Sequence, residues 1–133
     1  MNKNRESELV ETLESCVNMQ DIDVTEFFKD LQKLGVNLQG SSTFKQILDF
    51  ASVIANEERL KIIFVLKDQD RCVCELEAIL DRSQPTISHH LRELESLGLI
   101  NSFKQGKFTH YKLEEERFNN YLELFHKAFG KLH

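Results

Sequence analysis

The chain has 133 residues, a formal net charge of −5, and 41% hydrophobic and 29% charged residues. This length and composition fit one globular domain with room for an appendage. The apolar runs are too short to span a bilayer, and the N-terminus is polar and acidic rather than that of a signal peptide. We therefore expect a cytoplasmic protein whose three cysteines stay reduced.

Charge is unevenly distributed along the chain. Residues 1–56 carry 5 basic and 9 acidic side chains, a balance of −4. Residues 83–112 carry 4 basic and 2 acidic side chains, a balance of +2. The second segment is therefore mildly basic on an acidic body. Such a weak positive patch suffices for nucleic-acid binding if a dimer doubles it.

The N-terminal part predicts two helices. Apolar residues recur there at spacings of three and four between glutamates, which predicts a helix over residues 5–19 with Cys16 on its apolar face. Asp23 and Glu26 form a capping-box pattern at the start of a second helix. Gly35 is expected to end that helix.

The segment 35–42 is rich in glycine and serine and is the expected internal boundary. It divides the chain into a helical N-terminal extension, residues 1–40, and a C-terminal domain, residues 41–133. Two further helices are predicted over residues 43–54 and 57–66. The core positions expected in the second of these are Leu60, Ile63 and Phe64.

The most informative stretch is residues 83–108. Ser83 is the expected N-cap of a helix with Pro85 in its first turn, where the missing N–H costs nothing. Residues 97–100 end that helix and start a strand, and residues 103–108 predict a basic hairpin. A helix of short polar side chains followed by a basic hairpin is typical of a winged helix-turn-helix that binds DNA. We therefore predict a mainly α fold with a small β-hairpin.

Candidate DNA contacts come from this helix and hairpin. Hydroxyl and amide groups suit base edges and phosphates in the major groove, and lysines at the hairpin tip suit phosphates or the minor groove. For His90, packing beside the core with a local hydrogen bond is an open alternative, and for Arg92 a solvated helix face. The predicted DNA-contacting residues are Ser83, Gln84, Thr86, Ser88, His89, His90, Arg92, Lys104 and Lys107.

A last helix is predicted over residues 115–131, with an apolar face too large for a small hairpin to cover. Exposed faces of this kind usually mark an interface, so we expect a homodimer. Packing against the N-terminal helices is the alternative. The predicted dimer-interface residues are Phe118, Tyr121, Leu122, Phe125 and Phe129.

Cys72 and Cys74 form a closely spaced thiol pair. In a regular α-helix two positions this far apart point about 200° away from each other, whereas in an extended segment they share a face. Both thiolates could bind one soft ion only if residues 72–74 are extended or the helix start is distorted. An internal disulfide at this spacing should be strained, so oxidation is expected to join chains or to modify one thiol.

Five stretches between about Ile54 and Leu113 carry a family resemblance. They are Ala55–Ile62, Cys72–Leu76, Ser83–Leu91, Leu94–Ile100 and Gly106–Tyr111. In this order the chain resembles the arsenical-repressor (ArsR/SmtB) family of winged helix-turn-helix transcriptional regulators. The resemblance implies a homodimeric repressor that releases double-stranded operator DNA on binding a toxic metal or metalloid, with arsenite or antimonite favoured.

The resemblance also suggests how the thiol pair is completed. Relatives with an arsenic site often have a third cysteine near the pair, which this chain lacks. In some members an N-terminal cysteine crosses the dimer to complete a cadmium or lead site. The resemblance thus implies a metal site of Cys72, Cys74 and Cys16, with Cys16 from the partner chain. The alternative is that Cys16 is a small apolar core residue.

Other functions stay open at this point. The same fold could carry a thiol-based redox regulator, a regulator without a metal ligand, or a protein-interaction module. The sequence holds no Gly-rich phosphate loop, nucleophile elbow or paired catalytic carboxylates, so we expect neither an enzyme nor an organic cofactor.

Overall fold

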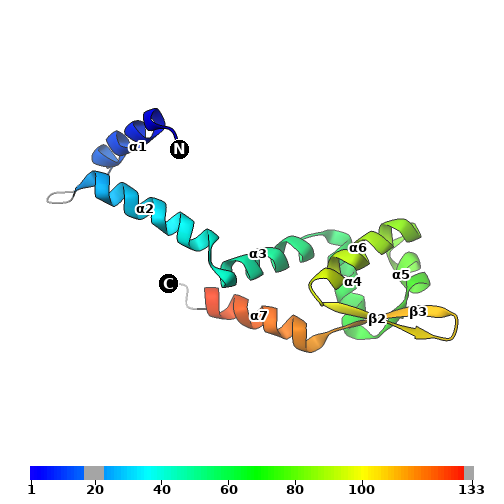
Figure 1. Cartoon of the computed structure of the whole chain (residues 1–133). Coiled ribbons are helices and arrows are strands. Elements are labelled where there is room, and N and C mark those ends of the chain that lie inside the picture. The colour runs from blue at the N-terminus through cyan, green and yellow to red at the C-terminus, as the bar shows by residue number, and fades with distance from the viewer. Residues whose placement is uncertain (17–22, 131–133) are drawn as a thin grey trace. The chain divides into compact units, whose positions relative to one another are not determined.

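The computed structural model describes residues 1–16 and 23–130. By their contacts, the residues group into two compact units, Met1–Phe44 and Lys45–His133. Figure 1 shows the helices of the first unit in blue and cyan, and the helices and sheet of the second in green to red.

The N-terminal unit is built on the helices α1 (Lys3–Cys16) and α2 (Val24–Gln39). The carboxylate of Asp23 accepts two backbone N–H groups from the first turn of α2, as the capping pattern predicts. The helix continues through Gly35 and ends at Gly40, so the predicted stop at Gly35 and the linker after it are wrong. An exposed glycine inside a helix costs only about 1 kcal/mol relative to alanine, so a single glycine does not by itself end a helix.

The C-terminal unit combines helices with a three-stranded antiparallel sheet of order β1–β3–β2. Figure 1 shows the β2–β3 hairpin extending away from the helices as a wing. This is the predicted winged helix-turn-helix, with β1 as an additional short strand. In chain order the elements are α3 (Ser42–Ile54), α4 (Glu57–Asp68), β1 (Arg71–Cys72), α5 (Val73–Leu80), α6 (Gln84–Ser96), β2 (Ile100–Gln105), β3 (Phe108–Leu113) and α7 (Glu115–Phe129).

The core of this unit joins the inner faces of its helices to the start of the sheet. In α4 the buried residues are Ile62, Ile63 and Leu66, whereas Leu60 and Phe64 are 42% and 64% exposed. The prediction that Leu60 and Phe64 are core residues is therefore wrong. The helix is rotated so that the side of α4 with Ile62, Ile63 and Leu66 faces the core. The side chains that are less than 2% exposed are Phe50, Ile62, Leu76, Ile87, Leu91, Leu94 and Leu99.

The last helix, α7, packs on α3 of the same chain. The rings of Phe118, Tyr121 and Phe125 lie with their centroids 5.4, 4.9 and 5.6 Å from that of Phe50. Edge-on and stacked pairs at these separations add to the stability gained by burying the rings. Three of the residues predicted at a dimer interface thus belong at least in part to an aromatic cluster inside the chain.

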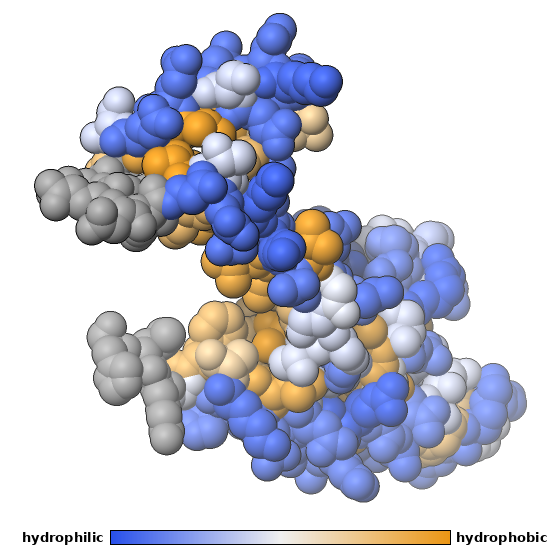
Figure 2. All heavy atoms as spheres, turned by 60° about the vertical axis from the view of Figure 1, so that its left-hand side comes forward, coloured by the Kyte–Doolittle hydropathy of each residue, from blue (hydrophilic) through white to orange (hydrophobic). Residues whose placement is uncertain are grey.

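The remaining predicted interface residues, Leu122 and Phe129, are 47% and 50% exposed. Leu48, on α3, is 54% exposed. Figure 2 shows hydrophobic surface beside the C-terminal end of α7. These exposed side chains leave an apolar surface on α3 and α7. In the described part of the chain, no helix has the length and apolar character needed to cross a membrane.

Candidate DNA-binding surface and thiol site

Helix α6 buries one face and presents its polar face to solvent. Ser83 is its N-cap and Pro85 lies in its first turn, as predicted, and Ser83 Oγ lies 3.2 Å from Thr86 Oγ1. The buried stripe of Ile87, Leu91 and Leu94 fixes how the helix is rotated. The predicted DNA-contacting residues that this rotation leaves exposed or half-exposed on the helix and its cap are Ser83, Gln84, Thr86, Ser88, His89 and Arg92.

His90 behaves differently from its neighbours. It is 7% exposed, and its Nε2 lies 2.8 Å from Oε2 of Glu58 in α4. The same carboxylate accepts a hydrogen bond from Arg82, in the turn before α6. Arg82 and then His90 hold the pKa of Glu58 below its usual 4.5. We therefore remove His90 from the predicted DNA contacts, since a buried ring bonded within the protein does not reach a base.

The wing places its basic side chains at an exposed tip. Gly106 adopts φ 65° in the turn between β2 and β3, a conformation that favours glycine. Lys104 and Lys107 on either side of it are exposed, and Phe108 is 59% exposed. The tip can therefore approach a phosphate backbone without first moving other parts of the chain.

The structure joins Cys72 and Cys74 in a disulfide. Cys72 ends β1 in an extended conformation, φ −79° and ψ 162°, and is the N-cap of α5. The extended residue brings the two sulfurs to one side, with a Cα–Cα distance of 5.4 Å that lies within the usual range for a disulfide. The geometric condition for sharing one ion is met, and the expectation that oxidation would avoid an internal disulfide is corrected.

Glu75 ties the thiol pair to the start of α5. Its carboxylate accepts the Cys72 N–H at 3.0 Å, and Cys72 Sγ accepts the Glu75 N–H at 3.4 Å. Arg71 donates a further hydrogen bond to Glu75. The Cys72 N–H, followed by Arg71, holds the pKa of the Glu75 carboxyl below its usual value. Because the sulfur of Cys72 itself caps the helix, a change at that sulfur acts directly on the first turn of α5.

Cys16 lies exposed at the end of α1, in the N-terminal unit. It is therefore not the core residue that the alternative interpretation expected. Within residues 1–16 and 23–130 no group of three or more histidine, cysteine, aspartate or glutamate side chains is assembled to hold a metal ion. A three-cysteine site with Cys16 thus stays a proposal.

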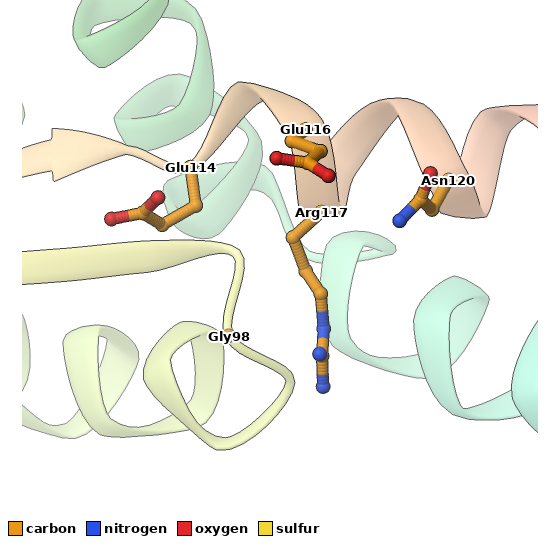
Figure 3. A pocket seen from close by; sticks show the side chains of 5 residues that line it. All are labelled: Gly98, Glu114, Glu116, Arg117 and Asn120. Carbon is orange, nitrogen blue, oxygen red and sulfur yellow. The ribbon is translucent and has the colours of Figure 1, made fainter.

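A pocket of about 410 Å³ lies where α7 begins, beside the turn that follows α6. Figure 3 shows the Arg117 side chain extending from α7 past Gly98. Arg117 Nε donates to the Leu97 carbonyl at 3.1 Å, and a Cβ built on Gly98 would lie 3.2 Å from that nitrogen. None of the predicted site residues lines this pocket. The contacts attach the turn at the end of α6 to α7.

Sequence reasoning missed Glu58 and Arg82 as residues that position the recognition helix. Their hydrogen bonds join residues 24 and 32 positions apart, so no local pattern could reveal them. The sequence did hold one partial signal. His90 lies next to the apolar stripe of α6, and a histidine buried there needs a hydrogen-bond partner from elsewhere in the chain.

Comparison with known proteins agrees with the winged helix-turn-helix fold described above. Residues 56–102 match the family described as "Bacterial regulatory protein, arsR family". The chain is 40% identical over 76 residues to the cadmium resistance transcriptional regulatory protein CadC of Listeria innocua, covering 56% of this chain and 64% of that protein. It is 47% identical over 62 residues to the arsenical resistance operon repressor of Escherichia coli, covering 46% of this chain and 53% of that protein. The matches to these two relatives span less than two thirds of their length.

Another relative, the transcriptional activator HlyU of Vibrio cholerae, is 36% identical over 76 residues, which is 57% of this chain and 70% of that protein. A solved structure of HlyU from Vibrio cholerae superposes with a TM-score of 0.56 and 30% identity, covering 68% of this chain and 99% of that one. The family match covers the segment from the start of α4 to the first residues of β2, and the superposition with HlyU covers about two thirds of the chain. The chain therefore belongs to the arsR family of bacterial regulatory proteins, a family of transcriptional regulators rather than enzymes.

Proposed function

We propose that the chain regulates transcription by binding operator DNA as a homodimer. Helix α6 would enter the major groove, and Lys104 and Lys107 at the wing tip would contact the phosphate backbone or the minor groove. The observation that carries this proposal is the exposed polar face of α6 over a buried apolar stripe. Dimerisation would double a weak positive patch on a protein of net charge −5.

The proposed inducer is a soft metal or metalloid, with arsenite or antimonite favoured, bound by the thiolates of Cys72 and Cys74. Support comes from the meeting of both sulfurs at the N-terminus of α5, the helix that precedes and packs on α6. Relatives named for cadmium and arsenical resistance also favour it. Ligand binding would remove the Cys72 cap, loosen α5 and release the operator, and Cys16 of a second copy is the proposed third ligand.

The test is arsenite titrated into the reduced full-length chain, beside Cys16→Ser and Cys72→Ser variants. Sulfur–arsenic charge transfer in the ultraviolet would report binding, and fluorescence anisotropy of labelled promoter DNA would report release. We expect both signals in the native protein and neither in Cys72→Ser. Loss of both in Cys16→Ser would support a three-sulfur site. A DNA complex that ignores arsenite, antimonite, cadmium, lead and zinc alike would overturn the proposed inducer.

A second candidate, a thiol redox regulator, is favoured by the Cys72–Cys74 disulfide. Here oxidation, rather than a metal, would change the first turn of α5 and with it the DNA affinity. Peptide mass spectrometry without reduction, after peroxide treatment, would detect the bond, and the DNA affinity of both forms would show whether it matters. Equal affinities of the oxidised and reduced protein would contradict this candidate.

A further inference from the structure

A histidine of the wing lies directly opposite the thiol pair. In the antiparallel register of β1 and β3, Cys72 pairs with His110, and in that of β2 and β3, Phe103 pairs with His110. Directly paired residues leave a sheet on the same face, with Cβ atoms about 4.5–5.5 Å apart. Cys72, His110 and Phe103 therefore form a row across the three strands.

A ring contact within the sheet and the position of β3 beside β1 place the imidazole of His110. Its ring stacks on Phe103 with centroids 5.5 Å apart and planes inclined by 22°. Its strand partner on the other side is Cys72, which β1 places directly opposite it. The half-buried His110 thus lies in the middle strand of the sheet, between Phe103 of β2 and Cys72 of β1.

We propose that His110 supplies an imidazole nitrogen beside the thiolates of Cys72 and Cys74, taking the place of the Cys16 thiolate as third ligand when the bound ion is a divalent cation. The inference rests on the proposed metal binding by the pair and refines its chemistry. Two sulfurs and one nitrogen suit a divalent cation of the zinc and cadmium type, whereas arsenite is better served by sulfur alone. Metal–sulfur and metal–nitrogen bonds of about 2.3 and 2.0 Å are within reach of side chains whose Cβ atoms are cross-strand neighbours.

The disulfide must be opened before these groups can bind a metal. A dithiol reductant would donate two electrons and two protons, yielding two cysteine thiols and its own disulfide. The cation then displaces the two thiol protons and takes the lone pair of the neutral imidazole. Among the described residues no group of three such side chains is assembled, and the two sulfurs are bonded to each other.

A ligand on β3 would connect the metal directly to the wing. β3 pairs with β2 along its whole length, and the turn between them carries the exposed lysine Lys107. Metal binding would then pull β3 towards the start of α5 and move the wing together with that helix. The DNA-binding hairpin would thus respond to the cation through one coordinate bond, in addition to any effect through α6.

The test is Cd²⁺ titrated into the reduced full-length chain, its His110→Asn variant and a matched His126→Asn control, in which an exposed histidine on α7 is removed. Cadmium-113 NMR distinguishes sulfur from nitrogen ligands, and thiolate charge transfer gives the affinity. We expect His110→Asn to weaken Cd²⁺ at least about tenfold, a loss typical even of outer-shell groups, and to lose the nitrogen ligand. His126→Asn should bind as the native chain does.

Two further measurements keep the inference testable if His110→Asn folds poorly. Nitrogen-15 NMR of the native chain should show the His110 ring shifting on Cd²⁺ binding, and His110→Cys should restore affinity with a stronger charge-transfer band. An unshifted ring, or His110→Asn with native affinity and ligand count, would overturn the role of His110 and leave the thiol pair intact. A native chain that binds no Cd²⁺ through Cys72 would instead overturn the proposed metal binding itself.

Discussion

Glu58 in α4 holds His90 in α6 through a hydrogen bond of 2.8 Å between Oε2 and Nε2. Its other oxygen accepts from Arg82, in the turn that leads into α6. The Nδ1 atom of His90 is buried and finds no partner among the described residues, so this bond is the polar contact shown for the ring. One carboxylate thus connects both the approach to the recognition helix and its middle to α4.

The first prediction concerns acid stability. Because Arg82 and His90 lower the pKa of Glu58 in the folded chain, the carboxylate binds a proton more weakly there than in the unfolded chain. Its contribution to stability is therefore fully present above its usual pKa of 4.5 and is lost as the pH falls below that value. We expect Glu58→Gln to be less stable than the native protein at neutral pH and to lose less on acidification.

Urea unfolding followed across the acid range measures this difference. Glu57→Gln is the matched control, because the Glu57 side chain is 81% exposed and forms a surface ion pair with Lys61, which contributes little to stability. Parallel stability profiles for the Glu58→Gln and native proteins would show that the Glu58 carboxylate does not hold the helix.

The second prediction separates the two roles of Cys72. Serine keeps an N-cap acceptor where alanine has none, so under reducing conditions Cys72→Ala should lose about 1 kcal/mol more unfolding free energy than Cys72→Ser. Both variants should lose the ligand response. Chemical unfolding and ligand titration of the two proteins provide the measurement. Equal stabilities would contradict the capping role seen in the Cys72–Glu75 contact.

The third prediction concerns DNA. Lys107→Gln should reduce the slope of log affinity against log salt concentration by about 1, and should weaken all DNA sequences similarly. Gln84→Ala should instead cost about 1–3 kcal/mol of discrimination against an altered operator, since an amide reads base edges. Fluorescence anisotropy at several salt concentrations measures both. Lys29→Gln, in the N-terminal unit, is the control and should leave both quantities unchanged.

The fourth prediction concerns the dimer. Leu122→Glu adds a charge to the exposed apolar surface of α7 and should shift the protein to monomers while it stays folded. Phe50→Ala, at a position only 1% exposed, should instead lower the unfolding free energy by about 3–5 kcal/mol. Analytical ultracentrifugation and chemical unfolding distinguish these outcomes. A Leu122→Glu protein with the native sedimentation coefficient would place the interface elsewhere.

Local sequence signals were enough to predict helix α6 and the turn of the wing. Ser83 and Pro85 mark the start of α6, and Gly106 marks the wing turn, because caps and positive φ angles depend on a few adjacent residues. The pairing of β1 with β3 was not predicted. A strand of two residues has no period of its own and is defined by its partner.

Parts of the candidate site could not be predicted because they depend on distant residues. The burial of His90 follows from Glu58, which is 32 positions away. The condition for two sulfurs to meet was predicted, but the disulfide was not, because it needed the extended N-cap conformation of Cys72. Which residues of α4 face the core likewise depends on what packs against it, since apolar residues occur on more than one side.

The shortness of β1 also determines how fast the thiol pair can react. Its two residues form one edge of the sheet, held to β3 by two residue pairs. Edges of this kind open locally at far lower free energy than the whole domain unfolds. Cys72 is 7% exposed, so its sulfur becomes available at the frequency with which this edge separates. Lengthening this two-residue strand would stabilise the closed edge, and would therefore lower both the rate at which Cys72 reacts and the apparent affinity of any partner that binds the open state.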